Sequence, residues 1–169
     1  PQDERLNTAS FTLQAYIFST TPEKGKQGIL TKWNEKAKSG YGLFIDENSC
    51  ISVMIGDGTG QVMNLSSEKK LMAKVWYLVA ASYDAETGKV KLYQEPCVTP
   101  TNGGLGMSLL HPADETTSVV EATNNLRPRA NNAPFLMAAC TLVDKSGRHI
   151  QGGHYKEVTS PVELPEQIL

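Results

Sequence analysis

The acidic residues are the natural place to look for chemistry, because two carboxylates about 5 Å apart can serve as the nucleophile and the acid of a glycoside hydrolase. All the acidic clusters of this sequence fall in expected turns, in loops or in the N-terminal tail, where solvated carboxylates are ordinary. We therefore expect no catalytic acid pair among them. These clusters are Asp3-Glu4, Asp46-Glu47, Asp84 with Glu86, and Asp114-Glu115.

Histidine and cysteine give no stronger signal. There is no GxSxG elbow and no HExxH helix, and the spacing Cys140-x8-His149-x4-His154 fits no metal signature. The three cysteines permit at most one internal disulfide, and small buried hydrophobic residues in strands are the favoured interpretation. The residues concerned are His111, His149 and His154, and Cys50, Cys97 and Cys140.

Two glycine clusters, at residues 56–60 and 103–106, are interpreted as turns. A phosphate-binding loop would need a helix N-terminus beside it, and neither cluster has a strand-to-helix setting.

Carbohydrate binding would need an exposed aromatic ring to stack on the C–H face of a sugar, with polar groups nearby for its hydroxyls. Aromatic residues make up only 7% of the chain, so a broad stacking platform is not evident. Trp76 opens the most apolar segment and is expected in the core. The candidate stacking residues are Tyr16, Trp33, Tyr41 and Tyr93.

The composition fits one soluble globular domain, and we predict a single domain over residues 1–169. A net charge of −2 with scattered basic residues gives no reason to expect a nucleic-acid or acidic-membrane partner. No run approaches the roughly 18 apolar residues of a membrane span. The chain begins without Met or an apolar signal region, as a trimmed or excised product would, so the compartment stays open.

Periodicity predicts an almost entirely β structure. Residues 10–17 alternate, with Phe11, Leu13, Ala15 and Ile17 on one face. The firmest local prediction is the hairpin of residues 75–83 and 89–93, whose linker ends in Gly88. Further strands are expected at residues 28–33, 41–45, 50–55, 61–65, 118–122 and 154–159, with a buried central strand at 134–140, one helical turn at 66–73 and a long loop from about 96 to 116.

Several of these segments resemble laminin G-like domains. The strand Phe11-Thr12-Leu13-Gln14-Ala15-Tyr16-Ile17 is similar to their first core strand, and residues 76–84 with 87–93 are similar to their W-x-x-V-A-x-[ST]-Y-D…T-G-x-[VIL]-x-L-Y hairpin. Segments 27–33, 40–46 and 51–58 match the strands between them in the same order. The resemblance implies an all-β, concanavalin A-like jelly-roll sandwich of two antiparallel sheets.

A narrower resemblance concerns the large subunits of N,N-dimethylformamidase-type proteins. Residues 21–33, 79–84 and 92–96 look like the laminin G-like segment of those subunits. The resemblance implies that the catalytic metal centre of those subunits lies outside this segment. None of its ligands can be mapped onto this chain. The chain would then be a non-catalytic part of a larger polypeptide.

The resemblance also suggests two site chemistries. Retaining β-glucanases of the superfamily carry an E-x-D-x-x-E strand motif, which is missing here. Many relatives hold Ca²⁺ through loop carboxylates and carbonyls, as suits a hard cation. The loop oxygen donors that would do so here are Asp46, Asn48, Asp57 and Asp84.

Three functions follow as hypotheses. The leading one is a non-catalytic lectin-like or accessory module that binds glycan or protein. The second is an architectural domain of a larger amidase-like enzyme. The third, a glucanase-type hydrolase, is disfavoured by the missing motif. Fold alone cannot choose among them, because function has to be argued from a site.

Overall fold

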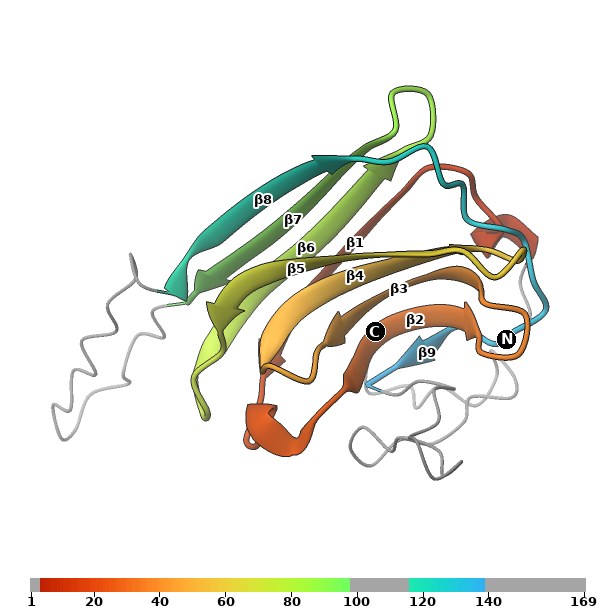
Figure 1. Ribbon diagram of the computed structural model, residues 1–169. Helices are drawn as coiled ribbons and strands as arrows, with labels where there is room; N and C mark the ends of the chain where they lie inside the picture. The colour runs from red at the N-terminus through yellow and green to blue at the C-terminus, as the bar shows by residue number, and fades with distance from the viewer. Residues whose placement is uncertain (1–3, 98–115, 139–169) are drawn as a thin grey trace, which may run out of the picture.

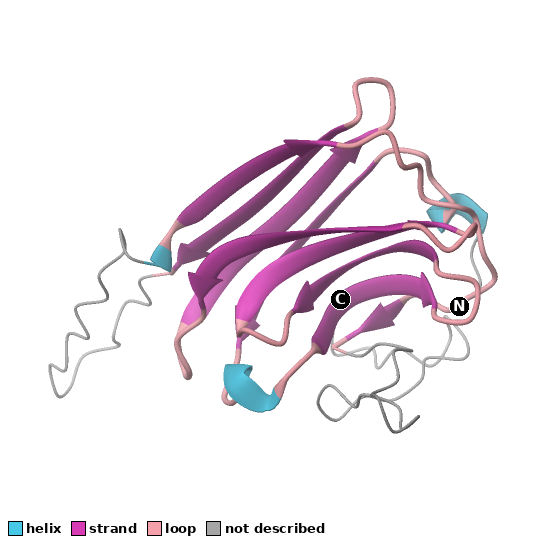
Figure 2. Cartoon of the chain, viewed as in Figure 1, coloured by secondary structure: helices cyan, strands magenta, loops and turns pink. Residues whose placement is uncertain are grey.

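The computed structural model describes residues 4–97 and 116–138 of the chain, and these form two antiparallel β-sheets packed face to face (Figure 1). Apart from short helical turns, strands and loops make up the described chain (Figure 2). The predicted all-β sandwich is thereby confirmed. The predicted long loop, the strand at 154–159, Cys140 and all three histidines lie outside the described residues.

The four-stranded sheet has the order β1-β6-β7-β8. Its strands alternate between buried and exposed side chains, so one face meets the core and the other meets solvent. The predicted hairpin is confirmed as β6 and β7, with Gly88 at φ +68° in the connecting turn. The strands are β1 (Phe11–Phe18), β6 (Trp76–Asp84), β7 (Lys89–Pro96) and β8 (Ser118–Thr123).

The five-stranded sheet has the order β5-β4-β3-β2-β9. Every residue of β3 is buried, and so is every residue of β4 except Asp57, which means that both faces of these strands are covered. The strands are β2 (Gln27–Asn34), β3 (Ser39–Ile45), β4 (Cys50–Asp57), β5 (Val62–Lys70) and β9 (Leu136–Met137). Two 3₁₀ turns, η1 (Glu4–Leu6) and η2 (Pro22–Lys24), flank β1 in sequence.

The core lies between the sheets and is built from the inward half of each alternating strand. Phe11 stacks on Tyr41 across the interface, with ring centroids 4.3 Å apart. Full burial of one such aliphatic or aromatic side chain contributes about 1.5–3 kcal/mol. The buried cluster includes Leu13, Ile29, Leu43, Ile45, Ile51, Val53, Ile55, Tyr77, Val79, Val90 and Leu92.

The helical turn predicted at residues 66–73 is wrong, because most of that segment continues β5 to Lys70. Ser66 or Ser67 would be the N-cap of such a helical turn, but both hydroxyls instead donate to residues distant in the sequence. Ser66 Oγ lies 2.8 Å from a carboxylate oxygen of Asp46, and Ser67 Oγ lies 3.0 Å from Oε1 of the buried Gln94. Polar bonds between distant segments therefore outweigh the local capping signal.

Two other predictions are also wrong. Within residues 134–138, the described part of the apolar run, the chain forms the two-residue β9 at the edge of its sheet, and the positive φ of Ala138 (+54°) takes it away from an extended conformation. Trp76, expected in the core, is 42% exposed. It lies on the solvent side of β6 because the inward positions of that strand are those of Tyr77, Val79 and Ala81.

Candidate functional site

The outer face of the four-stranded sheet carries a group of exposed aromatic and aliphatic side chains. Phe18 lies opposite Trp76 in the β1–β6 register, and their ring centroids are 5.3 Å apart. The next pair on the same face of the sheet is Tyr16 with Leu78. Further across the sheet, Tyr93 of β7 pairs with Val119 of β8. We call this group the aromatic face: Tyr16, Phe18, Trp76, Leu78, Tyr93 and Val119.

The exposure of this face is high for such residues. Tyr16 is 64% exposed, Phe18 44% and Val119 63%, while Tyr93 and Leu78 are half-buried. The Tyr93 hydroxyl donates to the carboxylate of Glu95, and this bond raises the pKa of Tyr93. The other end of the same sheet is polar, with Lys91 and Glu121 paired at 2.7 Å. Contiguous exposed apolar surface of this kind marks an interaction site more often than scattered single residues do.

Two of the four predicted stacking residues do not reach the surface. Trp33 is 1% exposed and Tyr41 3% exposed, so the expectation of an accessible ring is wrong for both. Tyr41 points into the core, where its hydroxyl donates to the carbonyl of Leu6 at 2.8 Å and burial raises its pKa. Tyr16 and Tyr93 remain accessible, and the structure brings them onto one face.

Trp33 belongs to a second buried cluster, with Phe44 and Met54, separate from the main core. These three alternate with core-facing neighbours such as Leu43 and Val53, which places them on the outer side of the five-stranded sheet. The aromatic rings lie over glycines. A Cβ on Gly56 would come within 2.7 Å of the Trp33 ring, and a Cβ on Gly42 within 2.7 Å of the Phe44 ring.

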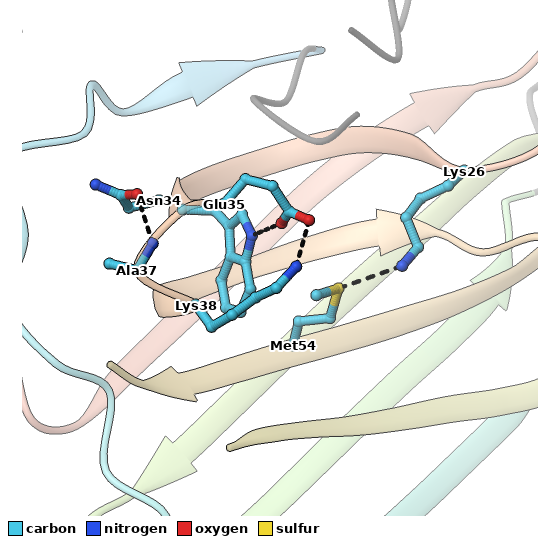
Figure 3. A network of polar contacts seen from close by, with 7 residues as sticks. Lys26, Asn34, Glu35, Ala37, Lys38 and Met54 are labelled. Carbon is cyan, nitrogen blue, oxygen red and sulfur yellow. Dashed lines mark hydrogen bonds and ion pairs between the residues drawn. The ribbon is translucent and has the colours of Figure 1, made fainter. Parts of the chain in front are cut away.

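Charged side chains border this cluster (Figure 3). The Trp33 indole donates to Glu35 at 2.7 Å, and the same carboxylate pairs with Lys38. Lys26 approaches the sulfur of Met54 at 3.6 Å. The indole is thus satisfied within the chain and is not presented to a ligand.

The predicted calcium donors are not brought together. Asp46 and Asp57 flank opposite ends of β4, and Asp84 lies in the other sheet. The residues that the structure describes contain no group of three or more His, Cys, Asp or Glu side chains placed to hold a metal. Calcium at Asp46, Asn48, Asp57 or Asp84 stays a prediction.

Each of these carboxylates has a local role in its turn. Asp46 accepts the backbone N–H groups of Asn48 and Cys50 at 2.8 and 2.9 Å. Asp57 accepts the N–H and hydroxyl of Thr59, and these bonds lower its pKa. Asp84 accepts the Thr87 hydroxyl at 2.6 Å and the Glu86 N–H at 3.0 Å, which lowers its pKa in the same way.

Two cysteines lie within the described ranges, and both are free thiols. Cys50 is buried, as predicted, and burial raises its pKa, whereas Cys97 is half-buried. Within the same ranges, no helix is long and apolar enough to cross a membrane.

Phe18, Trp76, Leu78 and Val119 were not predicted from the sequence as parts of a surface site. The signal was present, since Tyr16 and Phe18 share a parity in β1 and Trp76 and Leu78 share one in β6. Only the register between β1 and β6 shows that the side chains of Tyr16, Phe18, Trp76 and Leu78 adjoin.

Comparison with known protein families identifies the family to which this fold belongs. The family model described as the concanavalin A-like lectin/glucanases superfamily matches residues 1–96 of the 169. The chain belongs to this superfamily. The predicted laminin G-like resemblance is thus confirmed.

Among curated relatives, this concanavalin A-like domain is similar to N,N-dimethylformamidase beta subunits. It is 34% identical to the subunit from Alcaligenes sp. over 110 residues, covering 65% of this chain and 14% of that subunit. It is 31% identical to the subunit from Paracoccus aminophilus over 133 residues, covering 79% of this chain and 17% of that subunit. The chain therefore spans about a sixth of the length of these relatives.

Solved structures with the same kind of fold are more distant. A structure described as a putative carbohydrate binding protein from Bacteroides ovatus shares 20% identity over 68% of this chain and 36% of its own, at a TM-score of 0.40. The Ruminococcus gnavus sialidase module CBM40, bound to α2,3-sialyllactose, shares 15% identity over 87% of this chain and 75% of its own, at a TM-score of 0.44.

Proposed function

We propose that this domain is a non-catalytic accessory module that docks onto the rest of a larger amidase-like polypeptide through its aromatic face. The observation that carries the proposal is the exposure of Tyr16, Phe18 and Trp76 as neighbours on one side of the four-stranded sheet, with Val119 exposed on the same side. Aromatic residues are enriched at protein–protein interfaces, and charged residues are depleted from the centres of such interfaces.

The similarity to dimethylformamidase beta subunits supports a larger polypeptide as the partner. In those relatives, more than four-fifths of the chain lies outside the matched segment. A domain held in such a chain can be anchored by one apolar face, because tethering raises the effective concentration of the two surfaces.

The composition of the aromatic face favours protein over sugar as its occupant. A sugar site needs polar groups placed for hydroxyls beside the stacking ring. The Leu78 and Phe18–Trp76 neighbours of Tyr16 are apolar, and the polar side chains of the same face, Gln14 and Glu95, lie on the other side of Tyr16 and beyond Leu78. Glycan binding by Tyr16 and Tyr93 is the alternative that experiment has to separate.

The test compares the isolated chain with the longer polypeptide that carries this domain in its natural reading frame. The double substitution Tyr16→Glu with Trp76→Glu should change the unfolding free energy of the isolated chain by no more than about 1 kcal/mol, because both side chains lie on the solvent side of their strands. In the longer polypeptide, the same pair should make the domain susceptible to limited proteolysis.

The matched control is Thr12→Glu with Ser82→Glu, on the polar part of the same sheet face, which should leave proteolysis unchanged. A reading frame that encodes no further domain would contradict the proposal. So would glycan-array binding, with or without Ca²⁺, that disappears on Tyr16→Ala or Tyr93→Ala, since that result would assign the face to a sugar. Turnover of a β-glucan by the purified chain would overturn its non-catalytic part.

A further inference from the structure

A second candidate surface, lined mainly by polar side chains, lies at one end of the sandwich, away from the aromatic face. The connection from β8 to β9 crosses this end and touches turns of both sheets (Figure 1). The N–H of Asn124 donates to the carbonyl of Gly88 in the β6–β7 turn at 2.8 Å, and the N–H of Arg129 donates to the carbonyl of Gly56 at 3.0 Å. The connection is therefore held at two points by the rigid scaffold, as binding loops are.

A hollow of about 580 Å³ lies between this connection and the β4–β5 turn. That volume is within the range of small-molecule sites. We call it the arginine hollow. Its lining residues are Asp57, Gln61, Asn124, Asn125, Leu126, Arg127, Pro128 and Arg129.

Two arginines on the connection give the hollow its charge. The guanidinium of Arg127 makes one long bond, at 3.3 Å to the carbonyl of Ala85, and that of Arg129 makes no hydrogen bond or ion pair with a residue of the described ranges. The chain has 18 acidic against 16 basic residues, so this lack of ion pairs does not come from a shortage of carboxylates. Free guanidinium groups recognise planar anions through paired N–H donors.

The stem of Arg129 is held in place by a glycine. A Cβ on Gly58 would lie 2.4 Å from Cδ of Arg129, so only glycine lets the stem pass this close. Gly58 also has φ +75°, a backbone conformation that glycine adopts without strain. The β4–β5 turn thus leaves space for the Arg129 side chain, which lines the hollow.

The remaining walls offer groups suited to a hydroxylated ligand. The side-chain amides of Gln61 and Asn125 make no hydrogen bond within the described part of the chain. Leu126, half-buried, packs against the main core, and Pro128 adds a second apolar wall. Amide groups can bind hydroxyls, and an apolar floor can contact the C–H face of a sugar ring.

We propose that the arginine hollow binds a sugar that carries a single carboxylate, such as a uronic acid. Two guanidinium groups against the one carboxylate of Asp57 leave a net positive charge, which matches a monoanion. Both oxygens of Asp57 are already engaged by Thr59, at 2.8 and 2.7 Å. This site shares no residue with the aromatic face, and its test is independent of the docking proposal.

The test is titration of the full chain with sodium glucuronate, followed by ¹⁵N heteronuclear NMR and calorimetry, with glucose and sodium acetate as separate arms. Glucuronate should shift the amide signals of residues 124–129 and 57–61 in a saturable way. Glucose lacks the carboxylate and acetate lacks the hydroxyls, so each should bind at least about tenfold more weakly. Acetate binding as tightly as glucuronate would reduce the hollow to a non-specific anion site and overturn the proposal.

Amino-acid substitutions test whether glucuronate binds in the arginine hollow. Arg129→Gln should weaken glucuronate binding by about tenfold or more, since a charge-assisted bond is lost. Lys36→Gln removes one positive charge from an exposed residue of the β2–β3 loop and should leave the affinity unchanged. Asn125→Ala should weaken glucuronate but not acetate. Equal affinity of wild type and Arg129→Gln, or no saturable shift with glucuronate, would contradict the proposal.

Discussion

The outer faces of the two sheets place their aromatic residues in opposite environments. On the five-stranded sheet, Trp33 and Phe44 lie over glycines and are buried within the chain. On the four-stranded sheet, Phe18 and Trp76 contact each other but stay more than two-fifths exposed. Aromatic residues thus pack within the chain on one face and remain accessible to a partner on the other. A family resemblance that identifies the fold cannot make this distinction.

The difference arises from what lies beneath each ring. Gly42 and Gly56 leave space on β3 and β4 into which the rings of Phe44 and Trp33 fit. The outer face of the four-stranded sheet instead has side chains beside its exposed rings, such as Leu78 opposite Tyr16. We infer that only the second face is free to bury further area against a partner.

The two tryptophans allow the most direct mutational comparison. Trp33→Ala should cost about 3–5 kcal/mol, because it leaves a cavity in a buried cluster and removes the hydrogen bond from the indole to Glu35. Trp76→Ala should cost no more than about 1 kcal/mol, because much of its ring already meets water. Urea unfolding followed by circular dichroism measures both. Equal losses would show that the two faces do not differ as described.

Adding one carbon to one face and two to the other gives a smaller contrast. A Cβ on Gly56 would lie 2.2 Å from the Lys38 carbonyl oxygen as well as against Trp33, so Gly56→Ala should cost at least about 2 kcal/mol. Ala80→Val, on the outer side of β6, should stay within about 0.5 kcal/mol. The readout is the thermal unfolding midpoint of each variant. A neutral Gly56→Ala would refute the close contact of ring and floor.

The hydrogen bonds of Gln94 form a polar seam between the sheets. Its contribution to stability can be tested by substituting two glutamines. Gln94 is buried and bonds Ser67 and the carbonyl of Thr116, so Gln94→Leu should cost about 2 kcal/mol by leaving those groups unsatisfied. Gln14→Leu, exposed on the outer face of β1, is the matched control and should be close to neutral. Denaturant titration distinguishes them. Similar small effects would mean that the seam does not stabilise the sandwich.

One turn in each sheet provides the smallest expected effect, a dependence on pH. Hydrogen bonds lower the folded-state pKa of Asp57 and of Asp84 below the unfolded value of about 3.9. Their contribution is therefore complete above about pH 4 and is lost as the pH falls through the folded-state values. The double variant Asp57→Asn with Asp84→Asn should flatten this acid branch of a stability–pH profile. An unchanged profile would show that the carboxylates do not act in the folded state.

Much of the fold could be predicted from local patterns, but exposure could not. Alternation in β1 and the glycine-ended turn of the β6–β7 hairpin are local signals, and the structure confirms both. Ser66 and Ser67 were misassigned because their partners, Asp46 and Gln94, are 20 and 27 residues away. Trp33 and Tyr16 are both aromatic residues in strands, and only the surroundings of each strand decide which one is accessible.

The central claim is that the aromatic face is covered in the longer polypeptide. Hydroxyl-radical footprinting with mass spectrometry reports the solvent access of individual aromatic side chains, with Trp33 as the internal reference for a buried ring. In the isolated chain, Tyr16 and Trp76 should be labelled strongly and Trp33 hardly at all. In the longer polypeptide, labelling of Tyr16 and Trp76 should fall to the level of Trp33. Unchanged labelling of Tyr16 and Trp76 in the longer polypeptide would contradict the account.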